Sequence, residues 1–133
     1  MATKRLHIDT ENDAYVLAIS CHQKSIKLAW EINRALNCEL GAQETLKENI
    51  YFIKELADQD YFKWQEPNER YTLHLFSNRG EKSLLVPSQN QIDYFFVVTG
   101  LYSELNFEEG TKKIKNIQSV LTAFPITLPQ VKK

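Results

Sequence analysis

The sequence predicts an α+β domain in which two or three helices pack on a mainly antiparallel sheet of four to six strands. Three observations lead to this class. An apolar run followed by a helical pattern opens the chain, several strand patterns follow one another between residues 61 and 99, and a second helical pattern comes after them. Strands grouped between helices favour antiparallel pairing, because short connections join neighbours that run in opposite directions.

Composition is consistent with one domain over residues 1–133. Hydrophobic residues make up 43% of the chain, enough for a core without a metal or a disulfide. Residues 1–13 are expected to form an arm or an edge strand, and residues 129–133 a frayed tail. The 16 basic and 17 acidic residues give a formal net charge of -1, so no long-range field would attract nucleic acid or anionic lipid.

Strands are expected wherever short apolar or alternating runs meet turn residues. Ala14–Ser20 is a continuous apolar run, too short for a helix. Ile92–Thr99 has apolar residues on both faces, which is typical of a central strand. Glu44–Asp58 fits both a helix and a strand, and we favour the helix. The other expected strands are Tyr61–Gln65, Arg70–Ser77, Ser83–Val86 and Ala123–Leu128.

Two segments have the 3.6-residue spacing of an amphipathic helix, Ile26–Leu36 and Thr111–Leu121. In the first, Trp30 is predicted to lie in the core, on a face that it shares with Ile26 and Asn33. Ser25 is expected to cap this helix, and Gly41 to stop it or to form the turn that follows it.

The chain lacks the motifs that identify most enzymes and metal proteins, including a glycine-rich phosphate loop, a nucleophile elbow and clustered metal ligands. No metal and no cofactor are therefore expected. Cys21 is a candidate reactive thiol because a helix N-terminus nearby would lower its pKa, although a small buried residue is the favoured interpretation. Cys38 follows at the far end of the same helix, about 25 Å away at ~1.5 Å per residue, so a disulfide is not expected.

The start of the sequence has no apolar run of the kind found in signal peptides, and no stretch approaches the ~18 apolar residues of a membrane span. With two cysteines that should stay reduced, this predicts a cytoplasmic protein without a membrane partner.

Two polar side chains fall at positions that the patterns predict to be apolar, and each needs a partner. Asn33 lies on the apolar face of the first helix, where it either holds the backbone of a nearby loop or lines a pocket. Asp93 begins the most apolar strand. Its expected donors are a cation, with Arg79, Arg70 and Lys24 as candidates, or the amides of the turn over residues 88–91, and the favoured role for it is structural.

The stretch Val86–Tyr94 (VPSQNQIDY) resembles the motif that names the IPExxxVDY family of small bacterial proteins. The likeness covers roughly residues 15 to 123 and includes Ser20–Asn33 and Phe76–Arg79, which contains Asn78. The resemblance implies a bacterial, cytoplasmic protein and no particular activity, since none is assigned to the family.

Within the motif, Pro87, Asp93 and Tyr94 match the family pattern, whereas Ser88 stands where the pattern has a glutamate. Any role that required an acid at that position is not implied for this chain. A proline that ends a strand, followed by polar turn residues, is typical of a corner that sets the backbone conformation.

Three functions remain open from the sequence. The favoured one is a non-enzymatic protein-interaction module, acting as a homodimer or with another protein. The second is an RNA- or nucleotide-binding module that uses aromatic side chains on the sheet. The least favoured is an enzyme with a polar pocket around Asn33, Asn78 and Asp93.

Overall fold

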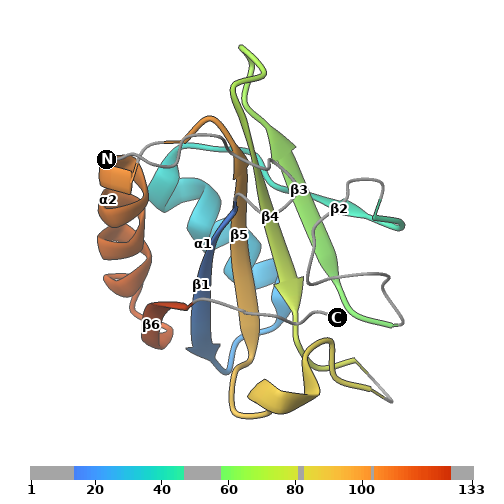
Figure 1. Ribbon diagram of the computed structural model, residues 1–133. Helices are drawn as coiled ribbons and strands as arrows, with labels where there is room; N and C mark the ends of the chain where they lie inside the picture. Colours follow the sequence, from blue (N-terminus) through green and yellow to red (C-terminus); the bar gives the residue numbers. More distant parts are fainter. Residues whose placement is uncertain (1–13, 47–57, 81–82, 103, 127–133) are drawn as a thin grey trace.

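The computed structural model describes residues 14–46, 58–80, 83–102 and 104–126 (Figure 1). The N-terminal arm, the C-terminal tail and most of the ambiguous segment Glu44–Asp58 lie outside the described residues. No helix in the described part of the chain is long and apolar enough to cross a lipid bilayer.

A six-stranded antiparallel sheet with two helices packed on it forms the fold, so the predicted α+β class is confirmed. The strands lie side by side in the order β2-β3-β4-β5-β1-β6. As predicted, the most apolar strand, β5, is central, and each side chain from Tyr94 to Val98 is buried. The strand bounds are β1 Ala14–Cys21, β2 Gly41–Gln43, β3 Tyr61–Gln65, β4 Tyr71–Ser77, β5 Tyr94–Gly100 and β6 Val120–Ile126.

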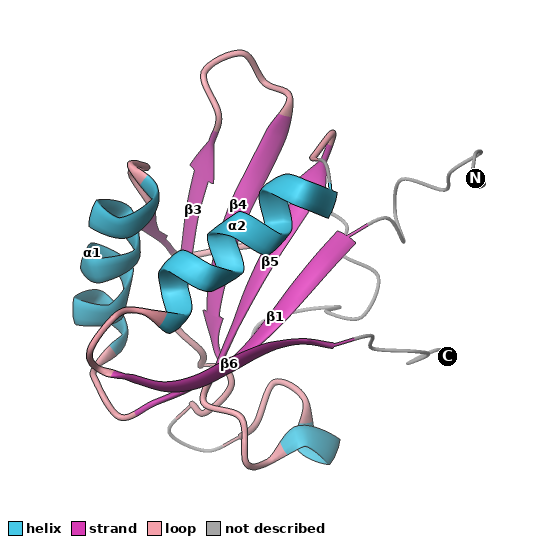
Figure 2. Ribbon diagram, turned by 90° about the vertical axis from the view of Figure 1, so that its left-hand side faces the viewer, coloured by secondary structure: helices cyan, strands magenta, loops and turns pink. Residues whose placement is uncertain are grey.

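Both helices, α1 (Ser25–Leu36) and α2 (Glu104–Lys115), lie on one face of the sheet, as Figure 2 shows from the helix side. Side chains that alternate along the strands form the core between the sheet and the helices. Leu17 and Ile19 of β1, for example, pack with Leu28 and Ile32 of α1 in this core.

The opposite face of the sheet has a second, smaller apolar cluster. Its sheet residues include Val16, Phe76 and Phe95, and it is completed by Val86 and Ile92 from the segment between β4 and β5. That segment includes the short 3-10 helix η2 (Pro87–Gln89). The two clusters explain why β5 is apolar on both of its faces.

Trp30 is the clearest error of the sequence analysis. The buried residues of α1 are Leu28, Ala29 and Ile32, whereas Trp30 is 53% exposed and Ile26 is 70% exposed. Each helical residue advances by about 100°, so Trp30 lies roughly 200° around the axis from Leu28 and cannot share its face. The aliphatic stripe of Leu28 and Ile32 occupies the core, and the face with Trp30 turns outward.

Several boundaries also differ from the prediction. Ser25 is the first residue of α1 rather than its cap, and its hydroxyl donates to Asp60 at 2.6 Å. The helix ends at Leu36, before Asn37, whose positive φ of 58° stops it, and Gly41 belongs to β2. Residues 83–86 form no strand, and Leu84 makes only an isolated bridge with Arg79, two residues after β4.

The second helix begins and ends earlier than the predicted Thr111–Leu121. Three lysines, Lys112, Lys113 and Lys115, occupy its last turn, where positive charge is favoured by the helix dipole. Val120 already belongs to β6, where a β-branched side chain fits pairing with β1.

Paired substitutions on α1 test which face is buried. Trp30→Ala should lower the free energy of unfolding by less than about 1 kcal/mol, because the ring is largely exposed. Ile32→Ala should cost about 2–5 kcal/mol, since Ile32 is fully buried. Urea unfolding of both variants measures the difference, and a larger cost at Trp30 than at Ile32 would show that the helix is rotated.

Candidate functional site

The side chain of Asn78, at the end of β4, is fully buried and uses both ends of its amide. Its Nδ2 donates to the carbonyl oxygens of Gln89 and Ile92, each at 2.9 Å. Its Oδ1 accepts from the amide of Val86 at 2.8 Å, and its own carbonyl accepts from the amide of Leu85 at 2.7 Å. One residue therefore holds the backbone of the segment from Leu85 to Ile92 against the end of β4.

Asp93 closes the same corner from the other side. Its Oδ2 accepts from the backbone amide of Cys21 at 2.9 Å, and its Oδ1 from Arg79 Nε at 3.3 Å. Arg79 also donates from Nη2 to the carbonyl of Asn90 at 2.6 Å. Arg79 was one of the donors predicted from the sequence. The second donor is the amide that ends β1, in place of the predicted turn amides.

The other two residues that match the family motif, Tyr94 and Pro87, also stabilise the backbone of this corner. Tyr94 is buried, and its hydroxyl donates to the carbonyl of Gln23 at 2.5 Å, just before α1. Burial raises the pKa of this phenol, so it stays a neutral donor near pH 7. Pro87 begins η2, where a residue without an amide proton is well tolerated.

Asn33 does not join this corner. It lies eight residues after Ser25 on α1, about 12 Å along the helix axis. Its Oδ1 accepts from the amide of Leu40 at 2.7 Å, and its Nδ2 donates to the carbonyl of Leu40 at 3.2 Å. The structure thus brings Asn78 and Asp93 together and leaves Asn33 at the other end of the helix, where it fixes the following loop.

Both cysteines are free and buried. Cys21 Sγ lies 3.8 Å from the hydroxyl of Ser119, which donates to Glu31 at 2.6 Å. Cys38 Sγ lies 3.4 Å from Asn33 Oδ1, and burial raises its pKa to about 11. A thiol with this pKa is almost entirely protonated at pH 7, which makes Cys38 a poor nucleophile.

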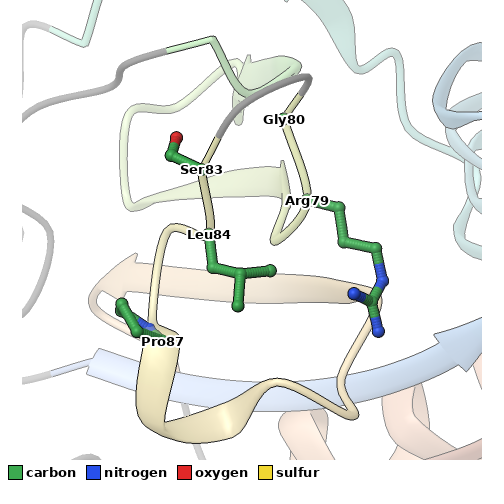
Figure 3. A pocket seen from close by; sticks show the side chains of 5 residues that line it. All are labelled: Arg79, Gly80, Ser83, Leu84 and Pro87. Carbon is green, nitrogen blue, oxygen red and sulfur yellow. The ribbon is translucent and has the colours of Figure 1, made fainter.

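Two open depressions flank the corner. One, of about 580 Å³, lies beside the turn that follows β4, and Figure 3 shows Arg79 extending to one side of it while Ser83 and Pro87 lie at the other. The second, of about 340 Å³, includes Asp93, Tyr94 and Ser25 among its lining residues. Both oxygens of Asp93 already accept hydrogen bonds, so the corner is built as a backbone clamp.

In the residues that the structure describes, no group of three His, Cys, Asp or Glu side chains is placed to hold a metal ion.

The sequence analysis missed a buried polar group on the face of the sheet opposite the helices. His74 of β4 is fully buried, with Nδ1 at 3.0 Å from the hydroxyl of Tyr61 and Nε2 at 3.1 Å from the hydroxyl of Thr99. The ring also stacks in parallel with those of Tyr61 and Phe76. The alternation along β4 places His74 and Phe76 on one face, and this was the signal that could have found the cluster.

No protein-family model matches the chain, and no curated protein matches its sequence. The resemblance to the IPExxxVDY family, drawn from the motif residues, therefore stays a prediction.

The clamp at Asn78 can be tested by an isosteric change. Asn78→Asp keeps the shape but replaces the Nδ2 donor by an oxygen that faces the carbonyls of Gln89 and Ile92, so unfolding should become easier by at least about 2 kcal/mol. Asn90→Asp, the same change at an exposed site, is the control and should change stability little. Equal melting temperatures for the two variants would contradict the clamp.

The raised pKa of Cys38 predicts a pH dependence. The folded protein disfavours the thiolate, so this contribution to stability is complete below pH 9 and is lost as pH rises from the ordinary pKa of 9.0 toward about 11. The loss should reach about 2–3 kcal/mol. Unfolding curves of wild type and Cys38→Ala across this range measure it, since the tyrosines titrate in both proteins. Parallel curves would refute the assignment to Cys38.

Proposed function

We propose that the protein is a protein-interaction module, and that it contacts its partner through the outer face of α1. We define this outer α1 face by the exposed residues Lys24, Ile26, Lys27, Trp30 and Arg34. The observation that carries the proposal is the exposure of Trp30 and Ile26, four residues apart on one helix. Tryptophan is enriched among residues that dominate binding energy, and exposed apolar pairs are favourable anchors.

The charges around Trp30 indicate the chemistry of the partner. Within α1 the one carboxylate beside the three cations is Glu31, which already accepts a hydrogen bond from Ser119. Asp60 likewise accepts one from Ser25 at the start of the helix. The guanidinium of Arg34 lies over the Trp30 ring, 4.9 Å from its centroid, which holds the ring in place. A basic surface around an apolar anchor is complementary to a protein segment that combines acidic residues with an apolar side chain.

A homodimer through this face is the less favoured arrangement. Two copies that met here would bring Lys24, Lys27 and Arg34 of each against the same cations of the other, and like charges in contact disfavour association.

RNA binding through the sheet also has less support. Five of the aromatic residues on which this alternative depends are buried in the two apolar clusters, namely Tyr61, Phe62, Phe76, Phe95 and Phe96. On the outer α1 face, three cations provide few contacts for a phosphate backbone.

A selection from a random peptide library displayed on phage, with the full chain as bait, tests the proposal. Enriched peptides should be acidic and contain an aromatic or aliphatic residue. Trp30→Ala should weaken the binding of a synthetic enriched peptide by tenfold or more, and Arg34→Glu should do the same. Lys112→Glu is the matched control, because it reverses an exposed charge on α2 and should leave affinity unchanged.

Three outcomes would overturn the proposal. Enriched peptides could bind Trp30→Ala as tightly as wild type. Sedimentation could show a dimer that depends on Trp30, which would assign the face to a second copy. A poly(U) oligonucleotide could bind in a Trp30-dependent manner more tightly than any peptide, which would assign it to RNA.

A further inference from the structure

A cavity of about 250 Å³ opens on the helix-covered face of the sheet, away from the outer α1 face and from the corner at Asn78. It lies over β3 and β4, which Figure 2 shows between the two helices. Three half-buried aromatic side chains line it from three different parts of the chain: Trp64 of β3, Tyr71 of β4, and Tyr102 just before α2. We call these three residues the aromatic box.

Neighbouring rings of the aromatic box meet at steep angles. The Trp64 and Tyr71 ring centroids are 6.3 Å apart with an interplanar angle of 66°, and the Tyr71 and Tyr102 centroids are 4.6 Å apart, also at 66°. Two parallel rings would be needed to sandwich a flat ligand such as a nucleobase. Rings at steep angles instead surround a compact, rounded group on several sides.

The cavity lining has one carboxylate and one ammonium group, and the end of a helix adds partial negative charge to it. Glu109 of α2 contributes a carboxylate to the cavity lining. Leu36 and Asn37 place the C-terminal end of α1 there, and the helix dipole makes that end partly negative. Burial raises the pKa values of Tyr71 and Tyr102, so both rings are neutral at pH 7. The positive group in the lining is Lys113, one helical turn after Glu109.

The glycine at position 110 leaves room for the cavity where a larger residue would reduce it. Glycine inside a helix is less favourable than alanine, yet Gly110 lies in the middle of α2. A Cβ added there would meet the Tyr102 hydroxyl at 3.7 Å and Leu36 Cδ2 at 3.9 Å, which are ordinary contact distances. Packing therefore does not require glycine at this position, whereas a methyl group would reduce the cavity between two of its lining residues.

We propose that this cavity binds a quaternary ammonium group, with the methyl groups held by the aromatic box and the charge balanced by Glu109. Such groups are compact and weakly hydrated, and the faces of Trp and Tyr rings attract them. The site is separate from the outer α1 face, so its ligand is independent of the proposed protein partner.

The decisive experiment compares two ligands of the same shape on the wild-type protein. Choline carries a trimethylammonium group, and 3,3-dimethylbutan-1-ol replaces it by a neutral tert-butyl group. Followed by NMR titration, choline should bind with a dissociation constant in the millimolar range and at least about tenfold more tightly than the alcohol. The shifted resonances should include the Trp64 indole N–H.

Two substitutions that remove opposite charges test whether Glu109 balances the charge of the ligand. Glu109→Gln should weaken choline binding several-fold, and Lys113→Gln should strengthen it, because the like charge is removed.

Gly110→Ala should weaken binding while the fold is kept, since the added methyl group meets no atom closer than 3.7 Å. Trp64→Phe should weaken binding while an apolar ring is retained, which separates the cation–π contribution from simple burial.

A third ligand, titrated against the wild-type protein, identifies the source of the ammonium group. N-acetyl-trimethyllysine amide presents the same trimethylammonium group on a peptide-like stem. If it binds more tightly than choline, the cavity is assigned to a modified protein side chain. If it binds more weakly, the cavity is assigned to a free small molecule. Three results would overturn the proposal. Choline and the neutral alcohol could bind with equal affinity, or choline could fail to bind at millimolar concentration. Glu109→Gln and Lys113→Gln could also change the affinity for choline in the same direction.

Discussion

The buried amide of Asn78 is the interaction on which the face of the sheet away from the helices depends. That face has its own apolar cluster, which Val86 and Ile92 complete from outside the sheet. Neither residue belongs to a strand, so no ladder of hydrogen bonds holds it there. Asn78 supplies the missing bonds, because its side chain accepts from the Val86 amide and donates to the Ile92 carbonyl. Only a side chain that both donates and accepts can do this.

The bonds of Asp93 and Tyr94 extend the same corner into the rest of the fold. Asp93 joins the end of β1, through the Cys21 amide, to the arginine that follows Asn78. Tyr94 bonds the residue two places before α1. The start of β5 is thus tied to the start of the helix and to the end of its neighbouring strand. Ser88, which stands in place of the motif glutamate, is exposed, so that difference leaves these bonds intact.

Fold class and the position of β5 could be predicted because they follow from patterns repeated over many residues. That Asp93 needs a donor was also predictable, since a carboxylate before an apolar strand is costly without one, and Arg79 was one of several candidates. The orientation of Trp30 was not, because the helix has apolar residues at two competing phases and only packing against the sheet decides between them. The aromatic box escaped detection because Tyr102, its third member, lies far along the chain from Trp64 and Tyr71.

The family-like motif and the proposed binding surfaces therefore occupy different parts of the molecule, for a physical reason. Residues that hold a corner together have their hydrogen-bonding groups already satisfied, as the two oxygens of Asp93 show, so little remains for a ligand. A ligand instead binds to side chains that still have exposed surface, such as an indole among cations or aromatic rings around a cavity. A shared motif of this kind would thus be informative about the fold. The ligand would be determined by residues outside the motif, Trp30 and Trp64 among them.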